Sequence, residues 1–506
     1  MDDQKVTQLR IETDMRKPAA YFFFFFLPFL SMLVFFLIVQ KNPLDFHLVF
    51  SDELDYWAET ATLIKRGLFS PNAGYFGYSF GNFARLSYFG AHGFFSLIPY
   101  ALIGIFTPRA QVTVLALNAF FMGISFSIAY YLIGSFRKIL VIALSLFVFY
   151  PFYLYYQTGM IETLFYAGSI ILAVLYIKCF TPGPRQQSFL RLYFWIVILF
   201  SLFRLSNLTL LIPAFFVEIR LEKQRFLPVL LKYGVLAVGV ALVSILTAAS
   251  YPWGFLSELG RSTEKLSLIV AHTVANINLY FGEGASNELE VWPRLLFLSW
   301  LFFLCFYFVF SKVLITKKTD YFLLSQILTM TAILFINLIF YDLGIFRDLR
   351  VFSPILVFSL IVCFLSDRGR VFIKIVFFLA VIFLLVSNYV VIIERNLAWD
   401  LFVARRYEAV HPPAILNSVR YNPDAKTRWE NTVYVDLIAY GQLDWQNYDP
   451  GMGLMVLGLE DIESLKSANP GSLLKAKYII SSQQGQLVGY DFITEISNLS
   501  LYIKAH

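Results

Sequence analysis

Long, uninterrupted apolar runs dominate the chain and predict its main elements. A helix needs roughly 17 to 25 mostly apolar residues to cross a lipid bilayer. The runs of that kind lie at 20–40, 111–134, 138–156, 161–180, 229–249, 295–315, 321–341, 350–366 and 371–393. The pattern therefore predicts a mainly α, polytopic helical membrane protein with about nine full spans.

Two further apolar runs, 88–106 and 192–217, are interpreted through the basic segments that separate the others. Lys and Arg concentrate in short cytoplasmic loops. The basic segments are MRK at 15–17, SFRK at 135–138, RQQSFLR at 185–191, EIRLEKQR at 218–225, SKVLITKK at 311–318 and DRGR at 367–370. All of them share one side if 88–106 does not cross and if 192–217 is a re-entrant pair of half-helices with its tip near Arg204.

This topology divides the chain into a short cytoplasmic N-terminus, a membrane domain and an external tail. Residues 1–19 precede the first span, and the membrane domain covers 20–393 with external loops at 41–110 and 250–294. From 394 to 506 the apolar runs stop, and short strand-like pieces such as GLMVLGL and AKYIISS alternate with turn sequences such as NPD and ANPG. The tail is predicted to be a small external α/β domain.

Composition and charge agree with a membrane protein and lower the weight of other classes. The chain is 58% hydrophobic and only 15% charged, which is far from the composition of soluble domains. Its net charge of +6 comes largely from the basic segments between spans, so nucleic acid is not an expected partner. The three cysteines all fall in apolar runs, which indicates neither a disulfide framework nor a metal site.

Ionisable side chains gather on the external side of this topology. The segment SDELDYW follows the first span, Glu162 opens the fourth, and arginines occur in FRLSN and FRDLR. The candidates in these segments are Asp52, Glu53, Asp55, Tyr56, Glu162, Arg204, Arg347 and Arg350. A charge inside the apolar boundary costs about 2.5 to 3.5 kcal/mol on insertion scales, so a cluster on one face predicts a functional cavity.

The chemistry that suits these groups is glycosyl transfer from a phosphate-linked sugar. A carboxylate beside a cavity can take the proton of an attacking hydroxyl group. Arginines can hold the phosphate of a leaving group through forked hydrogen bonds. No group of His, Cys and acidic residues has the spacing of metal ligands, so no cofactor is predicted, and a divalent metal stays an open alternative.

Ordinary structural roles compete with each functional one. The acids of SDELDYW could belong to a hydrated loop, and Glu162 could stabilise the N-terminus of its helix. Arg347 and Arg350 flank a span and could extend to the lipid headgroups, whereas Arg204 lies inside an apolar run.

Two residues of the first external loop are weaker candidates. His92 lies in an apolar helix, where an interfacial or core histidine is commoner than a ligand. Arg85 nearby is a candidate phosphate contact.

Several motifs, taken in order, resemble the GT-C superfamily of membrane glycosyltransferases. They are SDELDYW after the first span, GAHGFFSLIPYALIG, GMIETLF, FRLSNLTLLIP and LRVFSPILVFSL, with AKYIISS and LSLYIKA in the tail. Two of them depart from the family pattern, because Ser206 and Asn207 follow Arg204 where a Pro is usual, and only Phe352 and Pro354 remain of a longer Tyr and Pro motif. Chain size, span count and tail resemble the serotype-converting O-antigen glucosyltransferases within that superfamily.

The resemblance implies a hexose, glucose favoured, carried on polyprenyl phosphate and transferred with inversion to a surface glycan such as the lipopolysaccharide O-antigen. The protein would then lie in the bacterial inner membrane with a periplasmic active site. Asp52 matches the catalytic base, with Glu53 as its competitor and Glu162 as a second acid. Arg204, Arg350, Arg347 and Arg85 would bind the donor phosphate, and Asp55, Tyr56 and His92 would line the substrate site. The alternatives are a transporter or flippase of a lipid-linked glycan, and an O-antigen polymerase or ligase.

Overall fold

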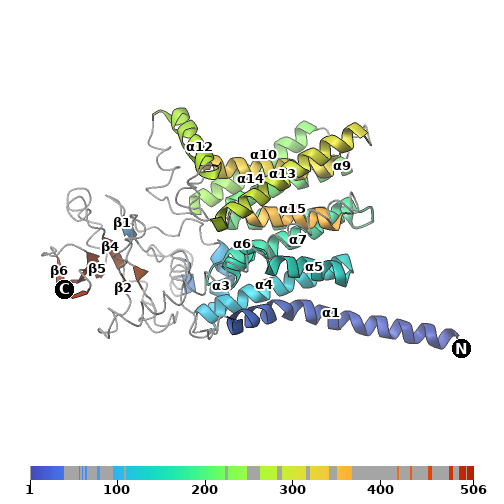
Figure 1. Cartoon of the computed structure of the whole chain (residues 1–506), viewed down its shortest axis with the longest axis horizontal. Helices are drawn as coiled ribbons and strands as arrows, with labels where there is room; N and C mark the ends of the chain where they lie inside the picture. Colours follow the sequence, from blue (N-terminus) through green and yellow to red (C-terminus); the bar gives the residue numbers. More distant parts are fainter. Residues whose placement is uncertain are drawn as a thin grey trace.

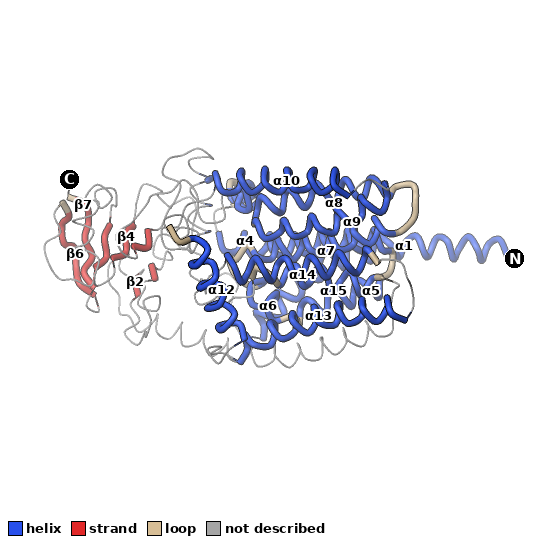
Figure 2. The backbone as a smooth tube through the Cα atoms, turned by 90° about the horizontal axis from the view of Figure 1, so that it is seen from above, coloured by secondary structure: helices blue, strands red, loops and turns tan. Residues whose placement is uncertain are grey.

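The computed structural model is a helical bundle with a small sheet beyond one end (Figure 1). The residues that the structure describes are 2–38, 56, 60, 63–64, 77–79, 95–107, 110–222, 226–247, 263–281, 288–314, 320–340, 350–366, 419–420, 434–435, 454–457, 478–481, 489–496 and 499–505. Most of the helices run along the long axis of the bundle, and the N-terminus lies at the end opposite the sheet (Figures 1 and 2).

Most helices of the described chain overlap the apolar runs, and one lies in the predicted external loop 250–294. The long ones are α1 (Asp2–Ile38), α4 (Ala110–Ile133), α7 (Glu162–Phe180), α8 (Gln186–Phe203), α10 (Phe226–Thr247), α12 (Lys265–Phe281), α13 (Glu288–Leu314) and α14 (Tyr321–Phe340). The shorter ones are η2 (Phe95–Leu97), α3 (Ile98–Gly104), α5 (Phe136–Phe147), α6 (Tyr150–Tyr156), η3 (Leu205–Leu210), α9 (Leu211–Glu222) and α15 (Ser353–Leu365).

Six helices in the described residues are long and apolar enough to cross a membrane, namely α1, α4, α7, α8, α10 and α14. These six helices indicate a multi-pass helical membrane protein, whereas the predicted count of nine spans is not confirmed. The last predicted run, 371–393, lies outside the described residues. The run at 295–315 lies in α13, of which only the shorter apolar stretch Leu296–Val309 is recognised. The differences at 138–156, 192–217 and 350–366 have local causes.

The run at 138–156 is divided into α5 and α6 instead of forming one span. Pro151 stands in the first turn of α6, where a missing N–H group is tolerated. A proline ring also clashes with the carbonyl group four residues earlier, and that residue, Phe147, is the last of α5. The proline therefore explains the division.

The run at 192–217 bends at Arg204, as predicted, but it is not a pair of half-helices. Arg204 has extended backbone dihedral angles (φ −156°, ψ 121°) between α8 and η3. With 18 residues, α8 is long enough to cross, and η3 and α9 return the chain to the other end. A hairpin of this kind keeps the two flanking basic segments on one side of the bundle. The predicted arrangement of the basic segments therefore stays unchanged.

The run at 350–366 forms α15, which has only 13 residues. At 1.5 Å per residue it is about 20 Å long, short of the ~30 Å of a hydrocarbon core. Nearly all of its residues are buried. Of the region 88–106, the described part forms only η2 and the seven-residue α3, which agrees with the prediction that this region does not cross.

Strands from two distant parts of the chain form one sheet. Its five strands, in spatial order, are β1 (Gly77–Ser79), β4 (Leu454–Leu457), β5 (Tyr478–Ser481), β7 (Leu499–Lys504) and β6 (Tyr490–Ile496). β1, from the first predicted external loop, pairs in parallel with β4 of the tail. The two regions therefore lie at the same end of the bundle, as the predicted topology requires.

The remaining described strands, β2 (Val419–Arg420) and β3 (Tyr434–Val435), form an antiparallel pair. In the tail β3, β4, β5 and β7 fall inside the predicted strand-like pieces, the first of them in NTVYVDLIAY, whereas β2 and β6 were not predicted. The described part of the tail contains no helix, so the helical part of the predicted α/β domain is not confirmed.

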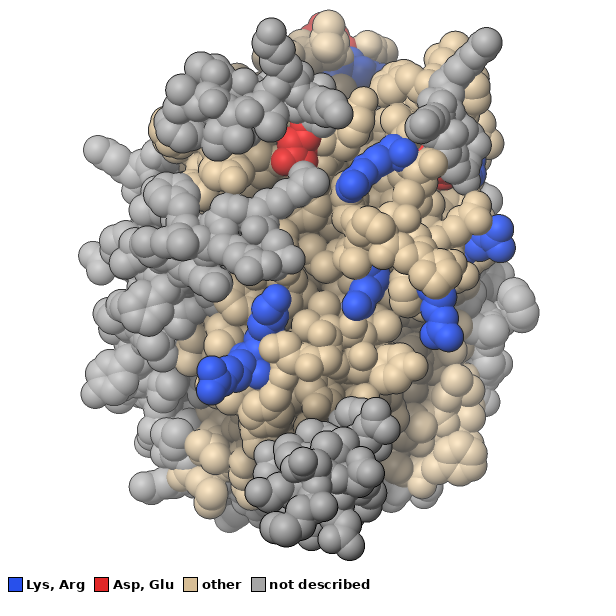
Figure 3. Space-filling view, turned by 90° about the vertical axis from the view of Figure 1, so that its right-hand side faces the viewer, with Lys and Arg blue, Asp and Glu red and all other residues tan. Residues whose placement is uncertain are grey.

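Lys and Arg side chains are spread over the end of the bundle opposite the sheet (Figure 3). Arg137 lies at the start of α5, Lys178 in the last turn of α7, Arg185 before α8 and Arg220 in the last turn of α9. Because neighbouring helices alternate in direction, these termini lie at one end. The basic segments of this part of the chain thus share a side, as the sequence predicted.

Candidate functional site

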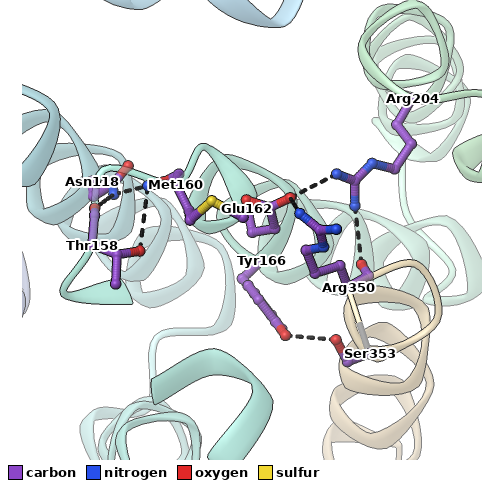
Figure 4. A network of polar contacts seen from close by, with 8 residues as sticks. All are labelled: Asn118, Thr158, Met160, Glu162, Tyr166, Arg204, Arg350 and Ser353. Carbon is purple, nitrogen blue, oxygen red and sulfur yellow. Dashed lines mark hydrogen bonds and ion pairs between the residues drawn. The ribbon is translucent and has the colours of Figure 1, made fainter. Parts of the chain in front are cut away.

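Three predicted residues meet at the end of the bundle opposite the basic helix termini, and Figure 4 shows the contacts between them. Glu162 begins α7, Arg204 occupies the break between α8 and η3, and Arg350 lies just before α15. Nη2 of Arg204 donates to Oε1 of Glu162 at 2.8 Å. Nη1 of Arg350 lies 3.9 Å from the same oxygen, and Nη1 of Arg204 donates to the backbone oxygen of Arg350 at 3.1 Å. We call these three residues the Glu-Arg cluster.

The Glu-Arg cluster is almost completely removed from solvent. Glu162 is 0% exposed, Arg204 5% and Arg350 8%. The cluster brings one carboxylate and two guanidinium groups together away from water. Removing an ion from water costs about several kcal/mol even after relaxation, so buried ions need partners with good geometry. Two neighbouring guanidinium groups are also suited to binding phosphate oxygens through charged hydrogen bonds.

Two more features favour an anionic or hydroxyl ligand at this place. The guanidinium carbon of Arg204 lies 4.4 Å from the ring centre of Phe165, so the ring supports one face of the cation. The second carboxylate oxygen of Glu162, Oε2, is buried and has no hydrogen-bond partner among the described residues. A buried acceptor without a donor is costly, and a ligand hydroxyl group could supply that donor.

The geometry bears on the structural alternatives left open for two of these residues. Glu162 lies in the first turn of α7, where an acid stabilises a helix N-terminus, and its side chain also accepts a hydrogen bond from Arg204. Arg350 is buried beside Glu162, so it does not extend to the lipid headgroups.

A polar network fixes the loop that delivers Glu162. Nδ2 of Asn118, on α4, donates to the backbone oxygens of Thr158 and Met160 at 3.3 and 3.0 Å. The hydroxyl group of Tyr100, on α3, donates to Oδ1 of Asn118 at 2.9 Å. Burial raises the pKa of the Tyr100 phenol well above its usual range and the charge of Glu162 raises it further, so the phenol stays a donor.

On the other side of Glu162, a hydrogen bond joins α7 to α15. The hydroxyl groups of Tyr166 and Ser353 are 2.6 Å apart, one turn after Glu162 and three residues after Arg350 (Figure 4). This contact holds the two helices in register at the cluster. Sequence reasoning did not select Asn118, Tyr166 or Ser353, and their one signal was a polar group within an apolar run.

The other predicted site residues are only partly covered by the structure. Tyr56 is buried, and its backbone oxygen accepts a hydrogen bond from Oγ1 of Thr60 at 2.6 Å. The candidates outside the described residues are Asp52, Glu53, Asp55, Arg85, His92 and Arg347. Their approach to the Glu-Arg cluster stays a prediction.

The part of the chain that the structure describes offers no obvious ligands for a metal ion. No group of three or more His, Cys, Asp or Glu side chains comes together there. Cys179 and Cys363 are buried free thiols, and Cys305 is half-buried.

Comparison with known proteins identifies no relative of the chain. No family model matches the chain, no curated protein matches it, and no solved structure matches it. The functional conclusion therefore rests on the residues themselves and on their geometry.

Proposed function

We propose that the protein is a membrane glycosyltransferase that moves a hexose, glucose favoured, from a polyprenyl-phosphate donor to a surface glycan such as the lipopolysaccharide O-antigen. The observation that carries the proposal is the Glu-Arg cluster, in which two buried arginines lie beside one carboxylate at one end of the bundle. Forked guanidinium groups suit the oxygens of a phosphate ester.

In the proposed reaction Asp52, or Glu53 in its place, takes the proton of an acceptor hydroxyl group. The hydroxyl oxygen attacks the anomeric carbon as the bond from that carbon to the phosphate oxygen breaks. Both electrons of the broken bond leave with the polyprenyl phosphate. Attack from the face opposite the leaving group inverts the anomeric configuration.

The cluster residues have separate roles in this reaction. Arg204 and Arg350 hold the phosphate, and Arg347 and Arg85 are further candidate contacts. Oε1 of Glu162 orients the two cluster arginines, and Oε2 is placed to accept a hydrogen bond from the acceptor. Asp55, Tyr56 and His92 complete the proposed lining. The end with the sheet would face the periplasm, and the protein would span the bacterial inner membrane.

Mass spectrometry of surface glycans tests the proposal. Bacteria that make a polyprenyl-phosphate hexose would express the wild type, Asp52→Asn, Arg204→Lys or Arg191→Lys at equal levels. Arg191→Lys is the matched control, because Arg191 is exposed at the other end of α8. Lysine keeps the charge and loses the fork. Arg204→Lys should lower transfer by about 10- to 100-fold, the equivalent of one charged hydrogen bond.

We expect one added hexose per repeat in the wild type and the control, and none with Asp52→Asn. An unmodified glycan in all four strains would contradict the transferase and favour a transporter or flippase of the lipid-linked glycan. A changed chain length instead of an added hexose would favour a polymerase or ligase. Equal addition by the wild type and Asp52→Asn would keep the enzyme and move the base to Glu53 or Glu162.

A further inference from the structure

The helix α12 differs from the spanning helices in direction and position. It lies near the end of the bundle that faces the sheet and runs steeply across the long axis in both views (Figures 1 and 2). Its 17 residues are not among the six candidate spans. The helix therefore needs an account separate from the bundle.

A buried hydrogen bond fixes α12 at the level where a spanning helix ends. Nδ2 of Asn276 donates to the backbone oxygen of Leu338 at 2.9 Å. Leu338 is two residues from the end of α14, and the last four carbonyl groups of a helix lack partners within it. Asn276 is 1% exposed and supplies one of the missing donors. α12 is thus fixed at the end of α14, where a crossing helix would leave the membrane.

The helical period gives α12 three different faces. The buried and half-buried face is made of Leu268, Ile269, His272, Thr273 and Asn276. A second face is exposed and apolar, with Leu266 76%, Val270 54%, Val274 50% and Ile277 39% exposed. The third face is exposed and carries small or polar side chains: Ser267, Ala271, Ala275 and Asn278. We call the second face the α12 stripe.

An exposed apolar side chain of α14 lies close to the level of the α12 stripe. Phe335 precedes Leu338 by three residues and is 56% exposed on a helix able to cross a membrane. We therefore expect lipid tails to reach its ring, less than one turn before the carbonyl group that accepts from Asn276. An amphipathic helix at such a boundary buries its apolar face among the upper acyl chains and keeps its polar face in water.

We propose that α12 is an interfacial helix whose α12 stripe is inserted in the outer acyl region of the bilayer, with the third face in water. We take the occupant of the stripe to be lipid, because α12 packs against the end of α14, whose Phe335 is exposed, and because the helix lies apart from the strands of the sheet (Figure 2). This placement anchors the 263–281 segment at the membrane surface. It does not depend on the proposed glycosyl transfer.

Spin labels on two faces of α12 test the proposal in the full-length protein. The three native cysteines would be replaced by Ala, and single cysteines introduced as Val270→Cys and Val274→Cys on the stripe. The matched controls are Ala271→Cys and Ala275→Cys on the third face. Each protein is labelled with a nitroxide and reconstituted in vesicles of phosphatidylethanolamine and phosphatidylglycerol. Collision rates are then measured with oxygen, which concentrates in lipid, and with a water-soluble nickel chelate.

We expect the ratio of oxygen to nickel collisions to be several-fold higher at the stripe than at the controls. Equal access of nickel to both faces would place α12 in water and overturn the proposal. High oxygen and no nickel at all four positions would place it inside the bilayer. Low access of both reagents to the stripe alone would mean that protein, such as a second copy of the chain, covers it. Each of these results can be obtained without any measurement of activity.

Discussion

At the scale of single residues, the Glu-Arg cluster depends on each of its charges. Removing one partner of a buried ion pair costs about 3 to 5 kcal/mol, because the remaining charge is left without compensation. Neutralising Glu162 would remove the carboxylate that Arg204 and Arg350 share. For this reason Arg204→Lys, which keeps the charge, is a better test of phosphate binding than a neutral substitution.

Asn118→Ala tests whether the network on α4 positions Glu162. The substitution leaves the backbone oxygens of Thr158 and Met160 without their side-chain donor. Buried unsatisfied groups cost about 1 to 3 kcal/mol, so we expect a loss of that size in stability, measured by thermal unfolding in detergent. The transfer reaction should slow as well, because the loop before Glu162 loses its support.

The matched control for this prediction is Ser145→Ala on α5. Ser145 Oγ donates only to the carbonyl group of Val141 in its own helix, and this bond is exposed. Its removal should change stability by less than about 0.5 kcal/mol. An unfolding temperature of Asn118→Ala equal to that of the control would show that the loop is held by other contacts.

At the scale of elements, small residues set the distances between helices. A Cβ atom at Gly123 on α4 would collide with the backbone oxygen of Phe25 on α1, and one at Gly168 on α7 would collide with the ring of Phe200 on α8. Membrane helices use small residues in this way to approach closely. In the sequence these glycines carry no signal of their own, since any apolar helix can contain one.

Alanine substitutions at three glycines should rank by what each Cβ meets. Gly123→Ala should destabilise most, by about 1 to 3 kcal/mol, since a backbone atom cannot rotate away. Gly168→Ala should cost less, because the Phe200 ring can turn. Gly234→Ala on α10, where a Cβ meets nothing within 4 Å, should stabilise by about 0.5 to 1 kcal/mol. Thermal unfolding of the three variants checks this order, and a destabilised Gly234→Ala would contradict it.

At the scale of the whole molecule, the charge distribution predicts how the bundle is inserted. The basic end shown in Figure 3 should face the cytoplasm, and the end with the sheet should face the periplasm. Gly183, in the short connection between α7 and α8, lies at the basic end and is exposed. Thr263, just before α12, is exposed near the other end.

Labelling with a membrane-impermeant maleimide checks this orientation. In a background without native cysteines, Thr263→Cys should react in cells with a permeable outer membrane, and Gly183→Cys should react only in inverted membrane vesicles. A Cβ at Gly183 meets nothing within 4 Å, so the substitution should leave the fold intact. The reverse pattern of labelling would place the sheet in the cytoplasm and would contradict the proposed periplasmic site.

Much of the bundle could be predicted because membrane insertion is a local property of the chain. The apolar length and the missing charges of α4, α7 and α10 are visible in the sequence alone. Where the prediction and the structure differ, the length of the apolar run alone does not decide whether a segment crosses. α15 has 13 residues but lies inside the protein, and α8 became a full crossing helix because its partner segment, η3 with α9, returns beside it.

The sequence by itself therefore determined that the protein is a helical membrane protein, where its basic segments lie and which ionisable residues are out of place in apolar surroundings. Only the tertiary structure decided that Glu162, Arg204 and Arg350 share one buried cluster, and that β1 joins β4 across more than three hundred residues of chain. The physical reason is that hydropathy acts over one helix, whereas pairing of charges and strands depends on which distant segments the packed bundle brings together.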